Sequence, residues 1–227
     1  QDLPTVLQVV CYRLRFWWVC SKNDAATLLE YAPDAVKRDR SCVLAAVKRH
    51  GQVLRYATDT LKSDREIVLA AVKLNGHALE HVNKDAAMWK ERGFVLSIVK
   101  LNGFALHYVT KTLKSDKEIV LAAVNDMGSA LQYANDILKS DKEIVLAAVQ
   151  KNALALQFAS DHLKGDMDVV REAFLKSLQE ADKSSVPNLL QYAGRPIQAD
   201  KTCVMAAVRK SGNALEYVNK EAVMWSE

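Results

Sequence analysis

SDKEIVLAAVNDMGSALQYANDIL, residues 115–138, is the stretch that decides the fold. It opens with the form of a capping box, in which the Ser115 hydroxyl accepts from the amide of Glu118 and the Glu118 carboxylate reaches back to the serine amide. We therefore expect a helix to begin here. The run 119–124 that follows is apolar at every position. It covers the whole circumference of a helix, so this helix must be packed on more than one side.

A glycine and a second apolar pattern follow this first helix. Gly128 lies where the end of a helix needs a left-handed residue, and we expect it to terminate the helix for that reason. Between 130 and 138 the apolar residues return at helical spacing and leave Ser129, Gln132 and Asp136 facing outward. The stretch therefore predicts two helices, the first apolar all round and the second amphipathic.

The same two-helix pattern recurs along the chain at a spacing close to 25 residues. Helices of about ten residues are marginal alone, so each unit needs its neighbours. We predict an all-α fold, an α-solenoid of tandem two-helix hairpin repeats, that forms one continuous domain over 39–227. Residues 1–38 are interpreted as a degenerate N-terminal repeat or cap with an aromatic insertion, Phe16-Trp17-Trp18, for which contact with a partner or a membrane surface is the alternative. The repeats start at Asp39, Asp64, Glu91, Asp116, Asp141, Asp166 and Asp200.

The repeat at Asp166 departs most from the pattern. Arg171 and Glu172 stand where other repeats have Leu and Ala, and extra residues are inserted around 182–186. We expect the stack to bend or loosen here, with residues 183–185 as an exposed loop.

Composition and charge exclude few classes of function. The chain carries 31 basic and 27 acidic residues, a formal net charge of +4, and the two signs are interleaved. This indicates a mildly basic surface and not a strong nucleic-acid signature. Equivalent positions in successive repeats form a column. Cys42 and Cys203 lie in a column that holds Ile in other repeats, so they are interpreted as buried apolar residues. Cys11 and Cys20 lack the spacing of metal ligands. A reducing compartment is compatible with this pattern, and we expect no membrane span.

Residues 116–124 and 130–134 closely resemble the repeat family known as domain of unknown function 4116 (DUF4116). The resemblance extends over nearly the whole chain from Asp39 onward. It implies a tandem helical-repeat fold of the kind found in arrays from protists, algae and some bacteria. It implies no activity, because none is settled for the family.

No catalytic, cofactor-binding or metal-binding constellation is expected. His81 stands in a column filled elsewhere by Tyr or Phe, which favours packing, and His50 takes a helix-end position used by Asn in other repeats, which favours capping. No HExxH, GxSxG or glycine-rich phosphate loop occurs. The enzyme hypothesis is therefore the remotest one, and a small-molecule substrate is not expected.

A contrast between columns favours binding. One inward column is the same residue throughout, at Leu54, Leu79, Leu106, Leu131, Leu156, Leu190 and Leu215, whereas the outward positions of the second helix vary between repeats. A solenoid that binds a partner has constant residues at its inward positions and variable residues at its outward positions, which together form a composite surface. Solvated faces also vary freely without any ligand. The predicted function is a non-catalytic scaffold or protein-interaction module, a structural subunit or segment of a larger assembly. The candidate partner-binding residues are Arg55, His77, Glu80, Phe104, His107, Gln132, Leu154 and Gln157, with Phe104 and Leu154 expected as exposed apolar contacts.

An RNA-binding solenoid is the alternative hypothesis. Repeats that each read one base are known, and basic residues recur here near first-helix ends and in the turns between repeats. Acidic residues follow the turn lysines, which blunts attraction for phosphates. The recurring basic residues are Lys48, Arg49, Lys73, Lys100, Lys151, Arg209 and Lys210 at helix ends, and Lys62, Lys114, Lys139 and Lys164 in turns.

Overall fold

The computed structural model describes residues 29–179, 185–210 and 212–219, and within these ranges the regular structure is helical, with no β-strand. The all-α repeat fold is therefore confirmed. The chain divides into two compact units, Gln1–Tyr108 (unit 1) and Val109–Glu227 (unit 2). The prediction of one continuous domain over 39–227 remains a prediction. The aromatic insertion at 16–18 and most of the expected loop at 183–185 lie outside the described residues.

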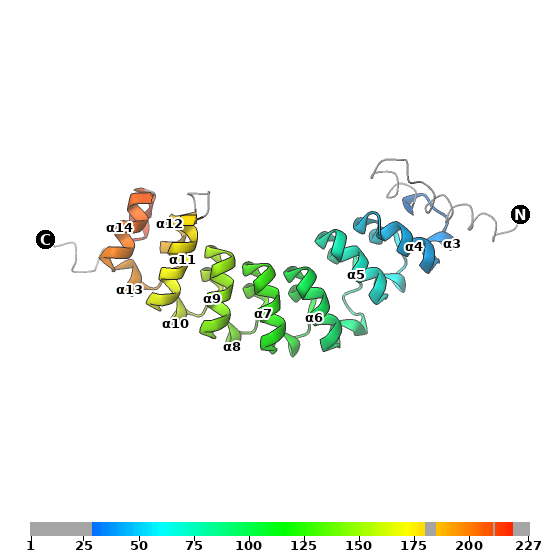
Figure 1. Ribbon diagram of the computed structural model, residues 1–227, viewed down its shortest axis with the longest axis horizontal. Helices are drawn as coiled ribbons and strands as arrows, with labels where there is room; N and C mark the ends of the chain where they lie inside the picture. The colour runs from blue at the N-terminus through cyan, green and yellow to red at the C-terminus, as the bar shows by residue number, and fades with distance from the viewer. Residues whose placement is uncertain (1–28, 180–184, 211, 220–227) are drawn as a thin grey trace, which may run out of the picture. The chain divides into compact units, whose positions relative to one another are not determined.

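Unit 1 alternates long α-helices with six-residue 3₁₀ helices (Figure 1). Short helical turns join one repeat to the next. The elements are α3 (Asp34–Arg38), α4 (Arg40–Val47), η1 (Gly51–Tyr56), η2 (Leu61–Ser63), α5 (Arg65–Leu74), η3 (Gly76–His81), η4 (Ala87–Lys90), α6 (Arg92–Leu101) and η5 (Gly103–Tyr108).

Unit 2 continues the same alternation, with its long helices side by side in Figure 1. Its described elements are η6 (Leu113–Ser115), α7 (Lys117–Asp126), η7 (Gly128–Tyr133), α8 (Asp136–Lys139), α9 (Lys142–Lys151), η8 (Ala153–Phe158), α10 (Asp161–Lys164), α11 (Met167–Gln179), α12 (Ser185–Tyr192), α13 (Arg195–Gln198), α14 (Lys201–Lys210) and η9 (Gly212–Tyr217). No helix among the described residues is long and apolar enough to cross a membrane.

The predicted second helix of each repeat is wrong in one respect: it is not a single α-helix. In the repeat at Asp116, a 3₁₀ helix ends at Tyr133, Ala134 is extended with φ −64° and ψ 158°, and a new turn starts at Asp136. A backbone hydrogen bond between repeats explains the break, because the amide of Asn135 donates at 3.2 Å to the carbonyl of Lys114 in the preceding repeat. Equivalent bonds run from Thr58 to Lys37, Asn83 to Lys62, Ser160 to Lys139, Gly194 to Lys164 and Asn219 to Gln198.

The N-cap of α7 is Asp116 and not Ser115, so the predicted capping box is wrong by one residue. The Asp116 carboxylate accepts from the amides of Glu118 and Ile119 at 3.0 and 3.3 Å. The Ser115 hydroxyl instead donates to the carbonyl of Lys111 and accepts from the Asn135 side chain at 2.8 Å. An aspartate is the better cap here because its charge also complements the helix dipole.

The predicted left-handed conformation of Gly128 is also wrong, since no described residue has a positive φ. The glycine is needed for space. A Cβ at Gly128 would collide with the carbonyl oxygen of Ala148, in the long helix of the next repeat. Gly51 meets the carbonyl of Ala71 in the same way, so these glycines mark the points where one repeat approaches the backbone of the next.

The core of each unit is built from columns of Val, Leu, Ile and Ala that the long and 3₁₀ helices contribute at matching positions. The constant leucine column is fully buried from Leu54 to Leu190, whereas Leu215, in the last described repeat, is 50% exposed. Within each unit, the long and 3₁₀ helices of neighbouring repeats pack against one another. At about 25 cal/mol per Å² of apolar surface, this contact between repeats is the main stabilising term.

Salt bridges also join neighbouring repeats. The basic residue directly after an N-cap reaches the N-cap carboxylate of the next repeat and the acidic residue two positions later; we call this arrangement the cation bridge. It joins Arg40 to Asp64 and Glu66 (both 2.7 Å), Lys117 to Asp141 (2.8 Å) and Glu143 (2.7 Å), Lys142 to Asp166 (2.9 Å) and Asp168 (2.7 Å), and Arg65 to Glu91. These cations lower the pKa values of Asp64, Asp141 and Asp166.

One expectation about cysteines is wrong. Cys42 is fully buried, as expected for its column, but it forms a disulfide, whose partner lies outside the described residues. Cys203 is a free thiol, and burial raises its pKa to about 11.

Candidate functional site

The candidate partner-binding residues lie on the 3₁₀ helices, at the outward positions that follow the glycine column. Arg55, His77, Glu80, His107 and Gln132 are exposed as predicted. Phe104, Leu154 and Gln157 are half-buried, so the expectation that Phe104 and Leu154 are exposed apolar residues is wrong. The Phe104 ring packs against His107 and Tyr108 of the same 3₁₀ helix, which leaves only part of this side chain to a partner.

The structure divides these residues between the two units. Unit 1 holds Arg55 on η1, His77 and Glu80 on η3, and Phe104 and His107 on η5. Unit 2 holds Gln132 on η7 and Leu154 and Gln157 on η8. We name the outward 3₁₀ positions of unit 1, namely Arg55, His77, Glu80, Phe104 and His107, the η stripe.

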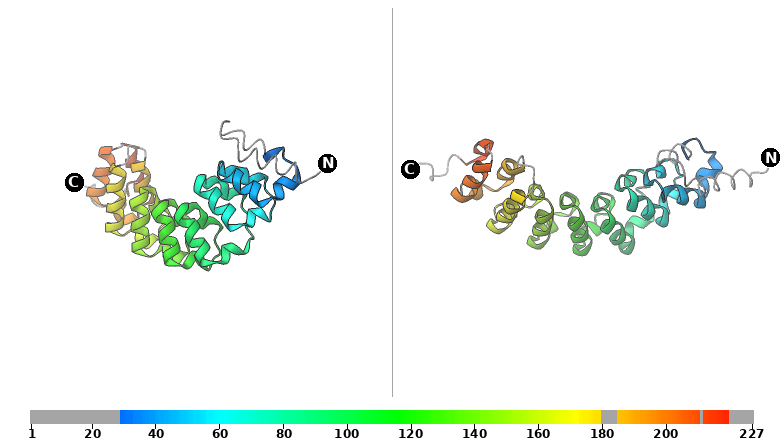
Figure 2. Two further views of the ribbon diagram at one scale, coloured as in Figure 1. Left: turned by 45° about the vertical axis from the view of Figure 1, so that its right-hand side comes forward. Right: turned by 45° about the horizontal axis from the view of Figure 1, so that its top comes forward.

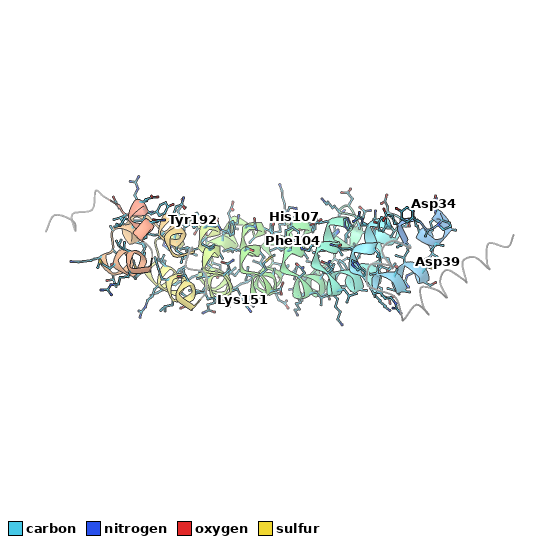
Figure 3. The ribbon with its side chains drawn as sticks, turned by 90° about the horizontal axis from the view of Figure 1, so that it is seen from above. Asp34, Asp39, Phe104, His107, Lys151 and Tyr192 are labelled. Atoms are coloured by element: carbon cyan, nitrogen blue, oxygen red, sulfur yellow. The ribbon has the colours of Figure 1, made fainter. Side chains whose placement is uncertain are left out.

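An aromatic cluster surrounds the η5 part of the stripe. The Phe104 and His107 rings stack with centroids 5.6 Å apart, and the His107 ring meets Tyr108 edge-on at 4.9 Å. Figure 3 labels Phe104 and His107 next to each other on the row of 3₁₀ helices. Below them the buried Trp89 lies 5.8 Å from Tyr108 and donates from its indole Nε1 to the carbonyl of Asn83 at 3.0 Å. The rings are thus held by one another before any partner arrives.

Charged side chains complete the η stripe. The Arg55 guanidinium lies over the Tyr56 ring, 4.9 Å from its centroid, and His77 Nδ1 lies 3.5 Å from the Glu80 carboxylate. The Tyr56 hydroxyl donates at 2.8 Å to Glu30, and this bond raises the pKa of Tyr56. These contacts orient exposed cationic and aromatic groups along one face of unit 1.

The outward positions of unit 2 are chemically plainer. The Gln132 side-chain amide donates to the carbonyl of Ser129 at 3.1 Å, which engages one of its two donors. Asp136 and Asp161 form ion pairs with Lys139 and Lys164, each at 3.4 Å. The unit 2 candidates therefore share a position with the η stripe but not its clustered rings.

Several of the basic residues on which the RNA hypothesis depends are already engaged. Among the turn lysines, Lys62 pairs with Asp59 at 3.8 Å, Lys139 and Lys164 pair as above, and burial lowers the pKa of Lys114. Lys48, at the end of α4, lies 3.7 Å from Glu66. Lys73, Lys100 and Lys151 are exposed on the row of long helices, where Figure 3 labels Lys151.

His81 and His50 are both partly buried. His81 is half-buried in the aromatic column, and burial lowers its pKa. His50 does not cap η1, contrary to expectation, and its Nδ1 is buried without a hydrogen-bond partner. Within the described ranges, no group of three His, Cys, Asp or Glu side chains lies close enough to hold a metal ion.

A groove between α11 and α14 was not predicted from the sequence. It has a volume of about 440 Å³ and is lined mainly by apolar side chains, including Met167 and Leu175. The signal was visible in Met167 and Arg171. The position of Met167 is a cation in the other repeats, and the position of Arg171 is leucine in all earlier repeats. The predicted bending or loosening of the stack at the Asp166 repeat stays a prediction.

The comparisons with known proteins agree with the repeat. The model of the family described as "Domain of unknown function (DUF4116)" matches the chain four times, over residues 20–61, 39–85, 91–139 and 141–185. Together these segments cover more than half of the chain. No curated protein and no solved structure matches.

Proposed function

Because the chain belongs to the family of domain of unknown function 4116, whose description states no activity, we propose from its own residues that it is a non-catalytic protein-interaction module. The binding surface is the η stripe of unit 1, centred on Phe104 and His107. The chain acts as a scaffold, and needs no cofactor for this role.

The stacked cluster of Phe104, His107 and Tyr108 carries the proposal. Aromatic and arginine side chains dominate the binding energy of protein interfaces when they are partly pre-packed and surrounded by polar groups. Here the rings contact one another at 4.9–5.9 Å, with Arg55, His77 and Glu80 on the neighbouring 3₁₀ helices. Because the rings are already ordered, these side chains lose little conformational entropy when a partner contacts them.

The ionisable groups support a binding role over a catalytic one. Lowered pKa values belong mainly to carboxylates that cap helices or join repeats, such as Asp64, Asp141 and Asp166. A structural cause accounts for each of these shifts, since a neighbouring cation is the first contribution. Catalytic groups are expected instead in a cleft with oriented partners.

The test is capture of proteins from native extract with the full chain, followed by mass spectrometry. The double variant Arg55→Glu/His107→Glu reverses and adds charge on the η stripe. Its matched control, Lys73→Glu/Lys100→Glu, changes two exposed cations on the long helices α5 and α6 of the same unit. We expect the stripe variant to capture roughly tenfold less, or still less, of the specific partners than the wild type does, and the control to capture them as the wild type does.

The same preparation separates the RNA alternative. Retention of the wild-type chain on RNA at low salt, lost steeply as salt rises and lost in the Lys73→Glu/Lys100→Glu control, would favour nucleic-acid binding. Protein capture that is equal for wild-type and stripe variants would contradict the proposal.

A further inference from the structure

The groove between α11 and α14 lies in the C-terminal part of unit 2, drawn in yellow to red in Figure 2. Its volume is about 440 Å³, and it is open to solvent. Phe174, Leu175 and Met167 form one wall, and Cys203 and Ala206 line the other. Met167 and Leu175 are 47% and 46% exposed, so both leave apolar surface at the groove open to solvent.

The groove exists because this junction lacks the contacts that close the others. At the preceding junction, Lys142 forms the cation bridge to Asp166 and Asp168, and α9 packs along α11. At the α11–α14 junction, Met167 takes the place of that lysine and Thr202 takes the place of the second acid. The long helix α14 packs mainly on α12, α13 and η9 instead.

Two further replacements add apolar surface and one cation to a lining that also contains Asp200. Leu175 stands in a column that is Lys, Asn or Gln in the earlier repeats, and Arg171 stands in the column of Leu121 and Leu146, which are half-buried. The first adds exposed apolar surface. The second removes the leucine that fills the space and adds a positive charge to the lining.

Arg171 forms no ion pair within the described part of the chain, although the carboxylate of Asp200 lines the same groove. The neighbouring carboxylates are engaged elsewhere: Asp200 caps α14 by accepting from the amide of Cys203 at 2.8 Å, and Asp168 pairs with Lys142. Glu172 accepts from the Gln150 side chain at 3.3 Å. A ligand with a carboxylate would therefore supply the missing partner of Arg171.

We propose that this groove binds an amphipathic, acidic helix of a partner protein, with apolar side chains against Met167, Phe174 and Leu175 and a carboxylate on Arg171. An open trough between two helices suits the apolar face of a third helix. A free fatty acid would need a pocket that encloses most of its surface, which this groove does not provide. The site is in unit 2 and does not depend on the η stripe.

The probe is a fluorescein-labelled, amidated helical peptide of Leu, Glu and Ala, with leucines at i, i+3, i+4 and i+7 and glutamates beside them. Its binding to the full chain is followed by fluorescence anisotropy. A peptide with Gln in place of Glu, one with Lys in place of Glu, and oleate as competitor are the comparison ligands. We expect saturable binding of the acidic peptide and roughly tenfold weaker binding of the Gln peptide.

Two variants restore the residues of regular repeats and so test binding without damaging the fold. Arg171→Leu refills the leucine column, and Met167→Lys restores the cation of the bridge next to Asp200. Both variants should keep or raise the melting temperature and should weaken the binding of the acidic peptide by roughly tenfold. Lys151→Ala removes an exposed cation from α9 and is the matched control; it and the stripe variant Arg55→Glu/His107→Glu should bind the peptide as the wild type does.

The outcomes are decisive in each direction. Equal binding to wild type, Arg171→Leu and Met167→Lys would overturn the site, and absence of saturable binding to the wild type would overturn the partner chemistry. Equal affinity for the acidic and Lys peptides would show that charge plays no part. Oleate binding that Arg171→Leu abolishes, with no peptide binding, would assign the groove to a lipid and overturn the helix.

Discussion

Gly128 shows at the residue scale how one repeat is fitted to the next. Its backbone is buried against the long helix α9, and a methyl group there meets the carbonyl oxygen of Ala148, which cannot rotate away. We predict that Gly128→Ala lowers the free energy of unfolding by about 1–3 kcal/mol, the usual cost of overpacking. Chemical denaturation of the full chain measures this change.

Gly93 is the matched control for this substitution. It lies in the first turn of α6, is exposed, and a Cβ there would meet no atom within 4 Å. Gly93→Ala should therefore be neutral or raise stability by up to about 1 kcal/mol, because it reduces the entropy of the unfolded chain. Similar losses in both variants would show that the glycine column has no packing role.

His81 gives a second prediction at this scale. Burial lowers its pKa from 6.5. As pH falls below 6.5 the unfolded chain takes up a proton before the folded chain does, so stability is lost in acid. His81→Tyr, which restores the aromatic of the column, should raise the melting temperature more at pH 5 than at pH 8. A gain for His81→Tyr that is equal at both pH values would contradict the argument.

At the scale of elements, the cation bridges join the start of one long helix to the start of the next. Lys142 holds the pKa of Asp166 below its usual range, and the pKa of Lys142 is raised in return. The stability from the carboxylate is present above its unfolded pKa of about 3.9 and is lost as pH falls through the lower folded value. The contribution of the lysine is lost above about pH 10.4.

We therefore predict that Lys142→Met, which places at this position the residue found at position 167, reduces the dependence of stability on pH in the acid range. Melting temperatures from pH 2 to pH 7 at low salt measure this. The wild type should lose stability more steeply below pH 4 than the variant, and added salt should reduce the difference. Lys151→Met, which removes an unpaired cation, is the control; a pH dependence in the acid range that is unchanged in Lys142→Met would show that the bridge is not coupled to folding.

The elements also show how far the sequence predicts this structure. The long helix 117–126 and its buried residues follow from a local apolar run, and local patterns survive folding. The break after Tyr133 does not follow locally, because the amide of Asn135 bonds to a carbonyl in the preceding repeat. Gly128 was assigned to the right place for the wrong reason, since helix ends and close approaches both select glycine.

The candidate site was less predictable than the fold for a related reason. Column comparison identified the outward positions, and the η stripe as a partner surface stays a prediction. It did not show that Phe104 is half-buried, because that depends on rings at His107 and Tyr108 meeting it. It showed that Arg171 breaks a column, but the groove depends on where α12 holds α14. The sequence shows which residues deviate from the repeat pattern, but the effect of each deviation on the surface depends on how the helices pack in three dimensions.

At the scale of the whole molecule, contacts between neighbouring repeats dominate within each of the two compact units. In a stack of this kind, a local loss of stability spreads to adjacent repeats and fades with distance along the stack. Leu131, fully buried in η7 of unit 2, is a suitable position for testing this, because η7 packs on α9 and η8 of the following repeat.

We predict that Leu131→Ala lowers local stability by about 2–5 kcal/mol. Hydrogen exchange of the full chain should show lost protection in α7, η7 and α9, and nearly unchanged protection in α4 and α5 of unit 1. The reciprocal variant Leu79→Ala, fully buried in η3, should give the opposite distribution. Uniform loss across both units in either variant would show that the chain unfolds as one cooperative block, in which case the contacts within each unit would not set the limits of cooperativity.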